Sequence, residues 1–274
     1  MTWQNIVWKS RLPQALTALV AGAGLAISGL QMQTVFRNPL AGPSVLGISS
    51  GASMGVAFVV LLSGSLGGVA LSKLGFMGEI ALSIAAVIGS LSVMALIVYV
   101  SQKVKGNVTL LIIGVMIGYV ANAVIGVLKF FSVEEDIRAY VIWGLGSFSR
   151  VSGNQMMLFV AIMAILIPLS FLLIKTLNLM LLGDGYARNL GLNIKRARLL
   201  VITSAGVLTA IVTAYCGPVI FLGLAVPHLC RAIFQTSDHR VLMPAVLFAG
   251  AALALACNLI ARMPGFEGLC RSTR

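Results

Sequence analysis

Long stretches without Asp, Glu, Lys or Arg recur along this chain and constrain its fold more than any other feature. They cover residues 12–36, 38–72, 80–102, 106–128, 151–174, 199–230 and 241–261. A helix needs about 20 consecutive apolar residues to cross the hydrocarbon core of a bilayer, and most of these stretches are long enough. The sequence therefore predicts an all-α membrane protein, a polytopic transmembrane helical bundle.

The composition agrees with a membrane protein and argues against binding of nucleic acid. Apolar residues make up 59% of the chain and charged residues 9%, whereas about a quarter of a soluble protein is charged. The net charge is +12, but the basic residues are scattered between apolar stretches and form no stripe with interleaved aromatics. We therefore expect the lipid bilayer, and not nucleic acid, as the partner of these charges.

The apolar stretches divide into spans where glycine and proline interrupt them. The stretch 38–72 opens within the turn-rich sequence RNPLAGP, and Cys216-Gly217-Pro218 interrupts the stretch 199–230. Glycine and proline break helices because one is conformationally permissive and the other lacks an amide hydrogen. The predicted spans are 13–33, 46–64, 80–101, 108–129, 155–176, 199–216, 218–234 and 241–261. The opening sequence MTWQNIVWKSRLPQ is polar and the first apolar run is too long for a signal peptide, so we interpret that run as a span.

The charges of the intervening loops predict which side of the membrane each loop faces. Alternate loops form two sets. The first set holds Arg37, Lys103, Lys105, Lys175, Arg188, Lys195, Arg196, Arg198, Arg231 and Arg240, with Asp184 and Asp238. The second set holds Lys73, Lys129, Arg138 and Arg150, with Glu79, Glu134, Glu135 and Asp136. Excess Lys and Arg marks cytoplasmic loops, so the first set is predicted to be cytoplasmic, including the long loop 177–198.

The sequence offers no chemistry for catalysis or metal binding. It contains no GxxxxGK[ST] phosphate loop, nucleophile-base pair, paired carboxylate or metal-ligand cluster, so we expect no catalytic residue, no metal and no cofactor. Cys216, Cys230 and Cys257 are interpreted as packing residues, and His228 as a structural hydrogen-bond partner. All seven acids lie outside the predicted spans, whereas ion-coupled carriers usually keep an ionisable group within the bilayer. Any energy source is therefore expected on another subunit.

Four segments resemble successive signature segments of the FecCD permease family. They are residues 11–55 (beginning RLPQALTALVAGAGLAISG), 181–200 (LLGDGYARNLGLNIKRARLL), 217–231 (GPVIFLGLAVPHLCR) and 238–262 (beginning DHRVLMPAVLF). This family supplies the membrane subunits of ABC importers for ferric siderophores, haem and cobalamin. The resemblance implies an inner-membrane permease with a second permease copy or paralogue, an ABC ATPase subunit inside, and a periplasmic or lipoprotein substrate-binding protein outside.

The resemblance also implies roles for two segments of the cytoplasmic set. Residues 182–192 are similar to the ATPase-coupling loop of the family, with Gly183, Asp184, Tyr186, Arg188, Asn189 and Gly191 as its candidate residues. Taken alone, this stretch is an amphipathic sequence long enough for one or two helical turns. The segment 37–47 must break a helix at the membrane edge. By resemblance it lies at the cytoplasmic mouth of the pathway, with Asn38 and Leu40 as candidate gate residues.

Three positions correspond by resemblance to the surface that receives the binding protein. Arg11 and Arg262 match arginines that meet acidic residues of the binding protein, and Gln14 replaces the second arginine of the usual RLPR. A guanidinium binds a carboxylate through two hydrogen bonds and carries a positive charge. Glutamine is neutral and cannot replace that charge. Without the resemblance, both arginines would be interpreted as interfacial anchors.

Both ends of the chain depart from the family pattern. The sequence starts almost at RLPQ and stops soon after ARMPGFEG, so we expect about eight spans of a ten-span permease fold, in one domain covering 1–274, with both termini outside. The tail CRSTR matches nothing expected, and a frameshift near codon 270 is one explanation. Two alternatives stay open: a truncated, non-transporting remnant that still inserts into the membrane, and an ATP-independent secondary carrier.

Overall fold

The computed structural model describes residues 7–65, 76–104, 106–151 and 153–261, which are helical with irregular connections and contain no strand. The elements in chain order are η1 (Val7–Arg11), α2 (Leu12–Phe36), η2 (Pro43–Leu46), α3 (Ile48–Ser65), α4 (Phe76–Lys103), α5 (Asn107–Phe130), α6 (Glu134–Gly144), η4 (Phe148–Arg150), α7 (Gly153–Phe171), α8 (Ile174–Leu181), α9 (Asp184–Asn189), α10 (Ile194–Cys216), α11 (Leu222–Phe234) and α12 (His239–Ile260). The predicted all-α class is confirmed.

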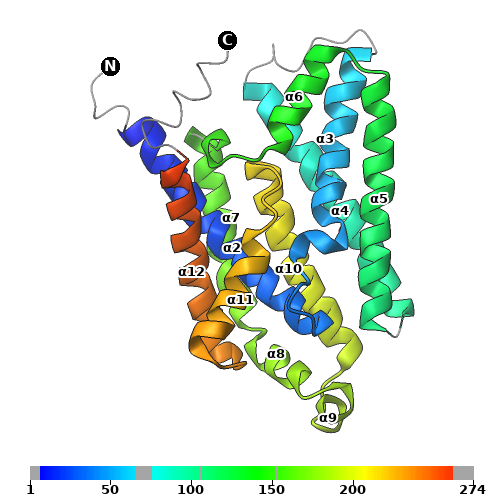
Figure 1. Ribbon diagram of the computed structural model, residues 1–274, viewed down its shortest axis with the longest axis vertical. Helices are drawn as coiled ribbons and strands as arrows, with labels where there is room; N and C mark the ends of the chain where they lie inside the picture. Colours follow the sequence, from blue (N-terminus) through cyan, green and yellow to red (C-terminus); the bar gives the residue numbers. More distant parts are fainter. Residues whose placement is uncertain (1–6, 66–75, 105, 152, 262–274) are drawn as a thin grey trace.

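Helix α2 is the central element of the bundle and packs against α7, α10, α11 and α12 (Figure 1). Its small residues explain this position. A Cβ atom at Gly22 would overlap the backbone of Gly250 in α12, and one at Gly29 would overlap the backbone of Gly223 in α11. Small residues let helices approach closely where lipid, not water, surrounds them. The glycine-rich sequence of α2 thus lets two neighbouring helices contact its backbone.

Helices α3, α4 and α5 form the other side of the bundle. Gly51 and Gly55 of α3 lie directly against Gly89 and Ala85 of α4, the same close packing as around α2. Helix α5 stands at the edge (Figure 1). Only 22% of its most apolar 18-residue stretch is buried, compared with 78% of the corresponding stretch of α2. Most of the surface of α5 is therefore free to face lipid or another protein.

All eight predicted spans contain a helix, although they differ in length. Among the described residues, α2, α10, α12 and the segments Gly78–Lys103 and Val108–Phe130 are each long and apolar enough to cross a membrane. The predicted span 155–176 is bent by 45° between Gln155–Phe171 and Ile174–Leu181. Two shorter apolar helices, Ile48–Leu61 and Leu222–Phe234, correspond to the predictions 46–64 and 218–234.

The prediction that a helix starts at residue 218 is wrong. Residues 217–221 are irregular and α11 has 13 residues, which gives a length of about 20 Å at 1.5 Å per residue. Gly217 has a φ of +79°, which most residues avoid, and Pro218 has no amide hydrogen to donate. The segment therefore runs from the end of α10 as irregular chain and becomes helical only at Leu222.

The two sets of loops separate to opposite ends of the bundle (Figure 1). The α9 end contains the C-terminal ends of α2 and α4, the start of α5, α8, α9 and the α11–α12 connection. The α6 end contains α6 and the junction between α10 and the segment 217–221. The described residues of the basic set thus gather at one end, as alternating spans require.

Cysteine labelling from outside the cell is expected to distinguish these two ends. In a background without the native cysteines, an impermeant maleimide should label Ser132→Cys and should miss Gly106→Cys and Asn193→Cys until the membrane is permeabilised. The reason is the excess of Lys and Arg at the α9 end, which favours a cytoplasmic location. A further predicted outer position, Gly75, lies outside the described residues. Labelling in the reverse pattern would overturn this orientation.

Candidate functional site

The segment similar to an ATPase-coupling loop forms a short projecting helix, α9, at the end of the bundle (Figure 1). Gly183 and Gly191 flank it with φ angles of +97° and +84°, a backbone conformation that favours glycine. Tyr186 is 74% exposed, and Arg188 and Asn189 are also exposed, whereas Ala187 is buried. The geometry therefore exposes one aromatic, one cationic and one amide side chain on the surface of α9.

Asp184 differs from these three residues because it faces the body of the protein. One oxygen of its carboxylate lies 2.6 Å from Nη2 of Arg37, and the other lies 3.7 Å from Nη2 of Arg198. Nη2 of Arg37 also donates to the carbonyl oxygen of Met180, at 3.2 Å. The first residue of α9 is thus held by the end of α2 and the first turns of α10.

The candidate gate segment directly follows Arg37. Arg37 itself has a positive φ of 49° and ends α2. Oδ1 of Asn38 accepts a hydrogen bond from the backbone N–H of Leu40, at 2.9 Å, a local turn that asparagine commonly makes. Leu40 is 67% exposed. The predicted helix break is confirmed, and it leaves a large apolar side chain on the surface at the α9 end.

The last turn of α2 carries further polar contacts, which the sequence analysis did not single out. Gln33 accepts a hydrogen bond from Arg231 at 2.7 Å and donates one to the carbonyl oxygen of Leu224 at 3.1 Å. The hydroxyl of Thr34 lies 2.8 Å from Nε2 of His239, and Nδ1 of that ring lies 2.7 Å from Oδ1 of Asn178. The signal in the sequence was the cluster of polar residues within an otherwise apolar span.

This network continues to Asp238, which caps α12. Its carboxylate accepts hydrogen bonds from the backbone N–H of Arg240, at 2.9 Å, and from Asn178, at 2.6 Å. The N–H of Arg240, followed by the amide of Asn178, lowers the pKa of Asp238 below its usual value. Asp238 therefore remains ionised and stabilises the N-terminus of α12.

Two of the three residues predicted to meet a binding protein, Arg11 and Gln14, lie at the start of α2, at the α6 end (Figure 1). Arg11 is exposed at the start of α2. Gln14 is buried, and its amide donates to the hydroxyl of Ser10 at 3.2 Å. Arg262 lies outside the described residues. Arg11 and Gln14 also line a small cavity of about 330 Å³ against Leu255 and Leu259 of α12.

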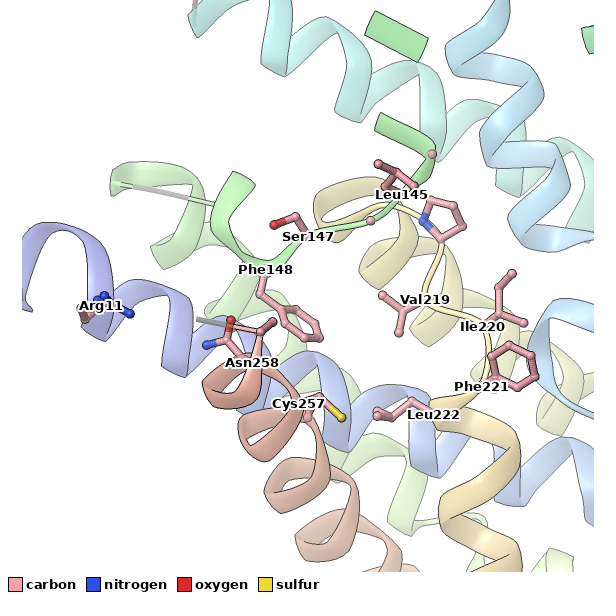
Figure 2. Close-up of a pocket in the computed structure, with 15 residues that line it drawn as sticks. Arg11, Leu145, Ser147, Phe148, Val219, Ile220, Phe221, Leu222, Cys257 and Asn258 are labelled. Carbon is pink, nitrogen blue, oxygen red and sulfur yellow. The ribbon is translucent and has the colours of Figure 1, made fainter. Parts of the chain in front are cut away.

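A larger cavity of about 840 Å³ opens beside the irregular segment 217–221 (Figure 2). Phe148 after α6 and Asn258 and Cys257 of α12 face Val219 and the residues that follow it across this space. The backbone N–H of Ser147 donates to the carbonyl oxygen of Cys216, at 2.7 Å, and ties the two irregular stretches together. Irregular backbone at membrane depth is tolerated where protein or water covers it.

The described residues contain no group of three or more His, Cys, Asp or Glu side chains that could hold a metal ion. His228 is exposed on α11. The thiols of Cys216 and Cys230 are buried, in agreement with a packing role, whereas that of Cys257 is exposed and lines the larger cavity.

Comparison with known proteins identifies the family. Residues 2–267 match the model of the FecCD transport family. The chain belongs to this family. It is 35% identical over 260 residues to the vitamin B12 import system permease protein BtuC of Klebsiella pneumoniae, covering 95% of this chain and 75% of that protein. It is 36% identical over 261 residues to the hemin transport system permease protein HmuU of Yersinia pestis, again covering 95% of this chain and 75% of the relative.

A solved structure has the same fold. It is described as an inward-facing conformation of an ABC transporter of the metal-chelate type, and the match has a TM-score of 0.83 and 30% identity over 94% of this chain and 79% of that one. The resemblance to FecCD permeases is thereby confirmed. This chain is a multi-pass membrane protein of a family of ABC importer permeases, which are transport subunits and not enzymes.

Proposed function

We propose that this chain is the inner-membrane permease subunit of an ABC importer for an iron complex, either a ferric siderophore or haem, or for cobalamin. The observation that carries this proposal is the 95% coverage by permeases named for vitamin B12 and hemin import. ATP hydrolysis takes place on a separate ABC ATPase bound at the α9 end, and a periplasmic or lipoprotein substrate-binding protein delivers the substrate at the α6 end.

The surface of α5 supports a second permease copy or a paralogue. Tyr119 and Asn122 lie near the middle of this helix and are exposed. An amide at that depth in lipid would lack hydrogen-bond partners, which is costly in a hydrocarbon environment. A second permease packed on this side would cover α5 or enclose a water-lined pathway against it, and either arrangement would satisfy Asn122.

Purification and reconstitution of the complex test this function against the two alternatives. The tagged full-length chain, isolated from the membranes of its own host in mild detergent, should bring an ATPase with it. In liposomes, the complex and its binding protein should take up labelled cobalamin, haem or a ferric siderophore only with ATP. Absence of ATPase and uptake would indicate a non-transporting remnant, and uptake without ATP would indicate a secondary carrier.

Replacing Arg188 and Asn189 together by alanine should reduce recovery of the ATPase about tenfold or more, because two central interface contacts of about 1 kcal/mol or more would be lost. Both side chains are exposed on α9, so insertion and folding should not change. The matched control is replacement of exposed Lys195 and Arg196, which lie on the next helix. Unchanged recovery with the Arg188 and Asn189 variant would count against α9 as the coupling site.

A further inference from the structure

The last turn of α2 and Arg37, which ends it, make polar contacts with α8, α9, α11 and α12 at the α9 end. Gln33 contacts Arg231 and the backbone of α11. Thr34 contacts His239 of α12, which in turn contacts Asn178 of α8. Arg37 contacts Asp184 of α9 and the last turn of α8. The C-terminal end of α2 is therefore the place where the elements around the candidate coupling loop meet.

Asp184 provides the charged part of this junction. Both ion pairs found among the described residues share its carboxylate, one oxygen facing Arg37 and the other facing Arg198. The side chain of Arg198 is 10% exposed, and those of Arg37 and Asp184 are each 43% exposed. The carboxylate is therefore directed toward the permease, whereas Tyr186 and Arg188 in the same short helix are directed away from it.

The backbone on either side of α9 turns at a glycine, so the ion pair between Asp184 and Arg37 is needed to connect α9 firmly to α2. Gly183 and Gly191 allow the chain to turn sharply before and after the helix, and glycine resists changes of backbone conformation less than other residues. A displacement of α9 can therefore be taken up by backbone rotation at Gly183 and Gly191, unless side chains connect the helix to its neighbours. Asp184 makes such a connection through its ion pair with Arg37. Arg37 directly precedes Asn38, the first of the two candidate gate residues.

We propose that Asp184 is a positioning residue that links the coupling helix α9 to the end of α2, so that displacement of α9 by the ATPase moves the segment 38–42. This inference rests on the proposed function and adds a route from the ATPase contact to the candidate gate. An exposed ion pair contributes about 1 kcal/mol or less to folding. Loss of the pair should therefore leave the fold intact and change the transmission of movement.

Transport per ATP hydrolysed is the quantity that should change. In reconstituted complexes, Asp184→Asn and Arg37→Met should each lower this ratio about fivefold or more. A fivefold effect is at the lower end of the range that is typical for energetic coupling between two sites. ATPase recovery should stay at the level of the unsubstituted chain. Asp184→Glu should restore most of the ratio, and the double variant should be no worse than either single variant, because both remove the same contact. Lys195→Met, an exposed change of equal charge to Arg37→Met, is the control.

A second measurement needs neither ATPase nor substrate. In the full-length chain in lipid nanodiscs, Asp184→Asn and Arg37→Met should speed hydrogen exchange of the amides in 185–192, whereas Lys195→Met should not. Unchanged exchange in both variants would overturn the link even if no ATPase were ever recovered. Loss of ATPase recovery with Asp184→Asn would instead make Asp184 an ATPase contact, and additive effects of the two variants would show that Arg37 and Asp184 act separately.

Discussion

Gly29→Leu is expected to prevent assembly of the bundle, so that little or no monodisperse protein is recovered in detergent. A Cβ atom at residue 29 would overlap the carbonyl group of Gly223, which belongs to the backbone of α11. Extra methylenes in a packed core cost about 1–3 kcal/mol when side chains can adjust. Here backbone faces backbone, so α2 and α11 would have to separate and the cost should be higher.

The control for this prediction is Gly144→Leu at the end of α6. A Cβ atom at Gly144 has nothing within 4 Å, so the same change of size should leave yield and thermal stability near those of the unsubstituted chain. The yield and thermal stability of Gly29→Ala should lie between those of Gly29→Leu and those of the control. Size-exclusion profiles and thermal aggregation temperatures would measure the series. Full yield of Gly29→Leu would mean that α2 and α11 do not approach each other in this way.

The spans could be predicted from the sequence because a lipid environment leaves few choices. A chain in hydrocarbon must satisfy its backbone hydrogen bonds internally, and a helix does so within one segment. The prediction of helices in all eight apolar segments therefore needed no knowledge of tertiary contacts. The predicted start of α11 was wrong for a local reason: Gly217 and Pro218 were recognised as a break, but the span was started at Pro218, and the chain becomes helical only at Leu222.

Helix α6 was missed because its sequence begins like a polar loop. Glu134, Glu135 and Asp136 occupy its first turn, where acidic side chains stabilise the positive end of the helix dipole. Only the later residues show an apolar face, with Tyr140 and Trp143 buried. An amphipathic helix of 11 residues is too short to stand out between two spans.

The exposed side of the candidate site could be predicted, but its buried side could not. The amphipathic pattern of 182–192 indicated a short helix, and the structure confirms it. Arg37 and Asp184 are 147 residues apart in sequence, and Thr34 and His239 are 205 apart. Such pairs depend on how the helices pack, which apolar patterning does not specify. The roles of these residues in an importer stay predictions.

The last prediction concerns delivery of substrate at the α6 end. Association of the cognate substrate-binding protein with the reconstituted permease should slow as salt increases, because the Debye length falls to roughly 8 Å near physiological ionic strength. Arg11 is exposed at this end. Arg11→Glu and Arg262→Glu should each slow association about tenfold at low salt. Tenfold is at the lower end of the rate increases that electrostatic steering produces. Stopped-flow fluorescence at low and moderate salt would measure these rates.

Gln14→Arg should accelerate association, and the structure shows how the change can be accommodated. Gln14 is buried, but it borders the cavity of about 330 Å³ shared with Arg11, Leu255 and Leu259. A longer side chain can lay its apolar stem in this space and extend its guanidinium to the surface. The new charge would then stand beside Arg11 and strengthen attraction to an acidic partner.

Arg138→Glu is the control that separates docking from a general effect of charge. Arg138 is exposed on α6 at the same end of the bundle, and its reversal changes the net charge by the same amount as Arg11→Glu. If Arg11 belongs to the docking surface, Arg11→Glu should slow association more than Arg138→Glu, and the difference should shrink with salt. Equal effects of the two reversals would assign the attraction to the overall field of the protein. Rates indifferent to salt and to Arg11→Glu would leave Arg11 as an interfacial anchor, since only a charge near the approaching partner can change its rate of encounter in this way.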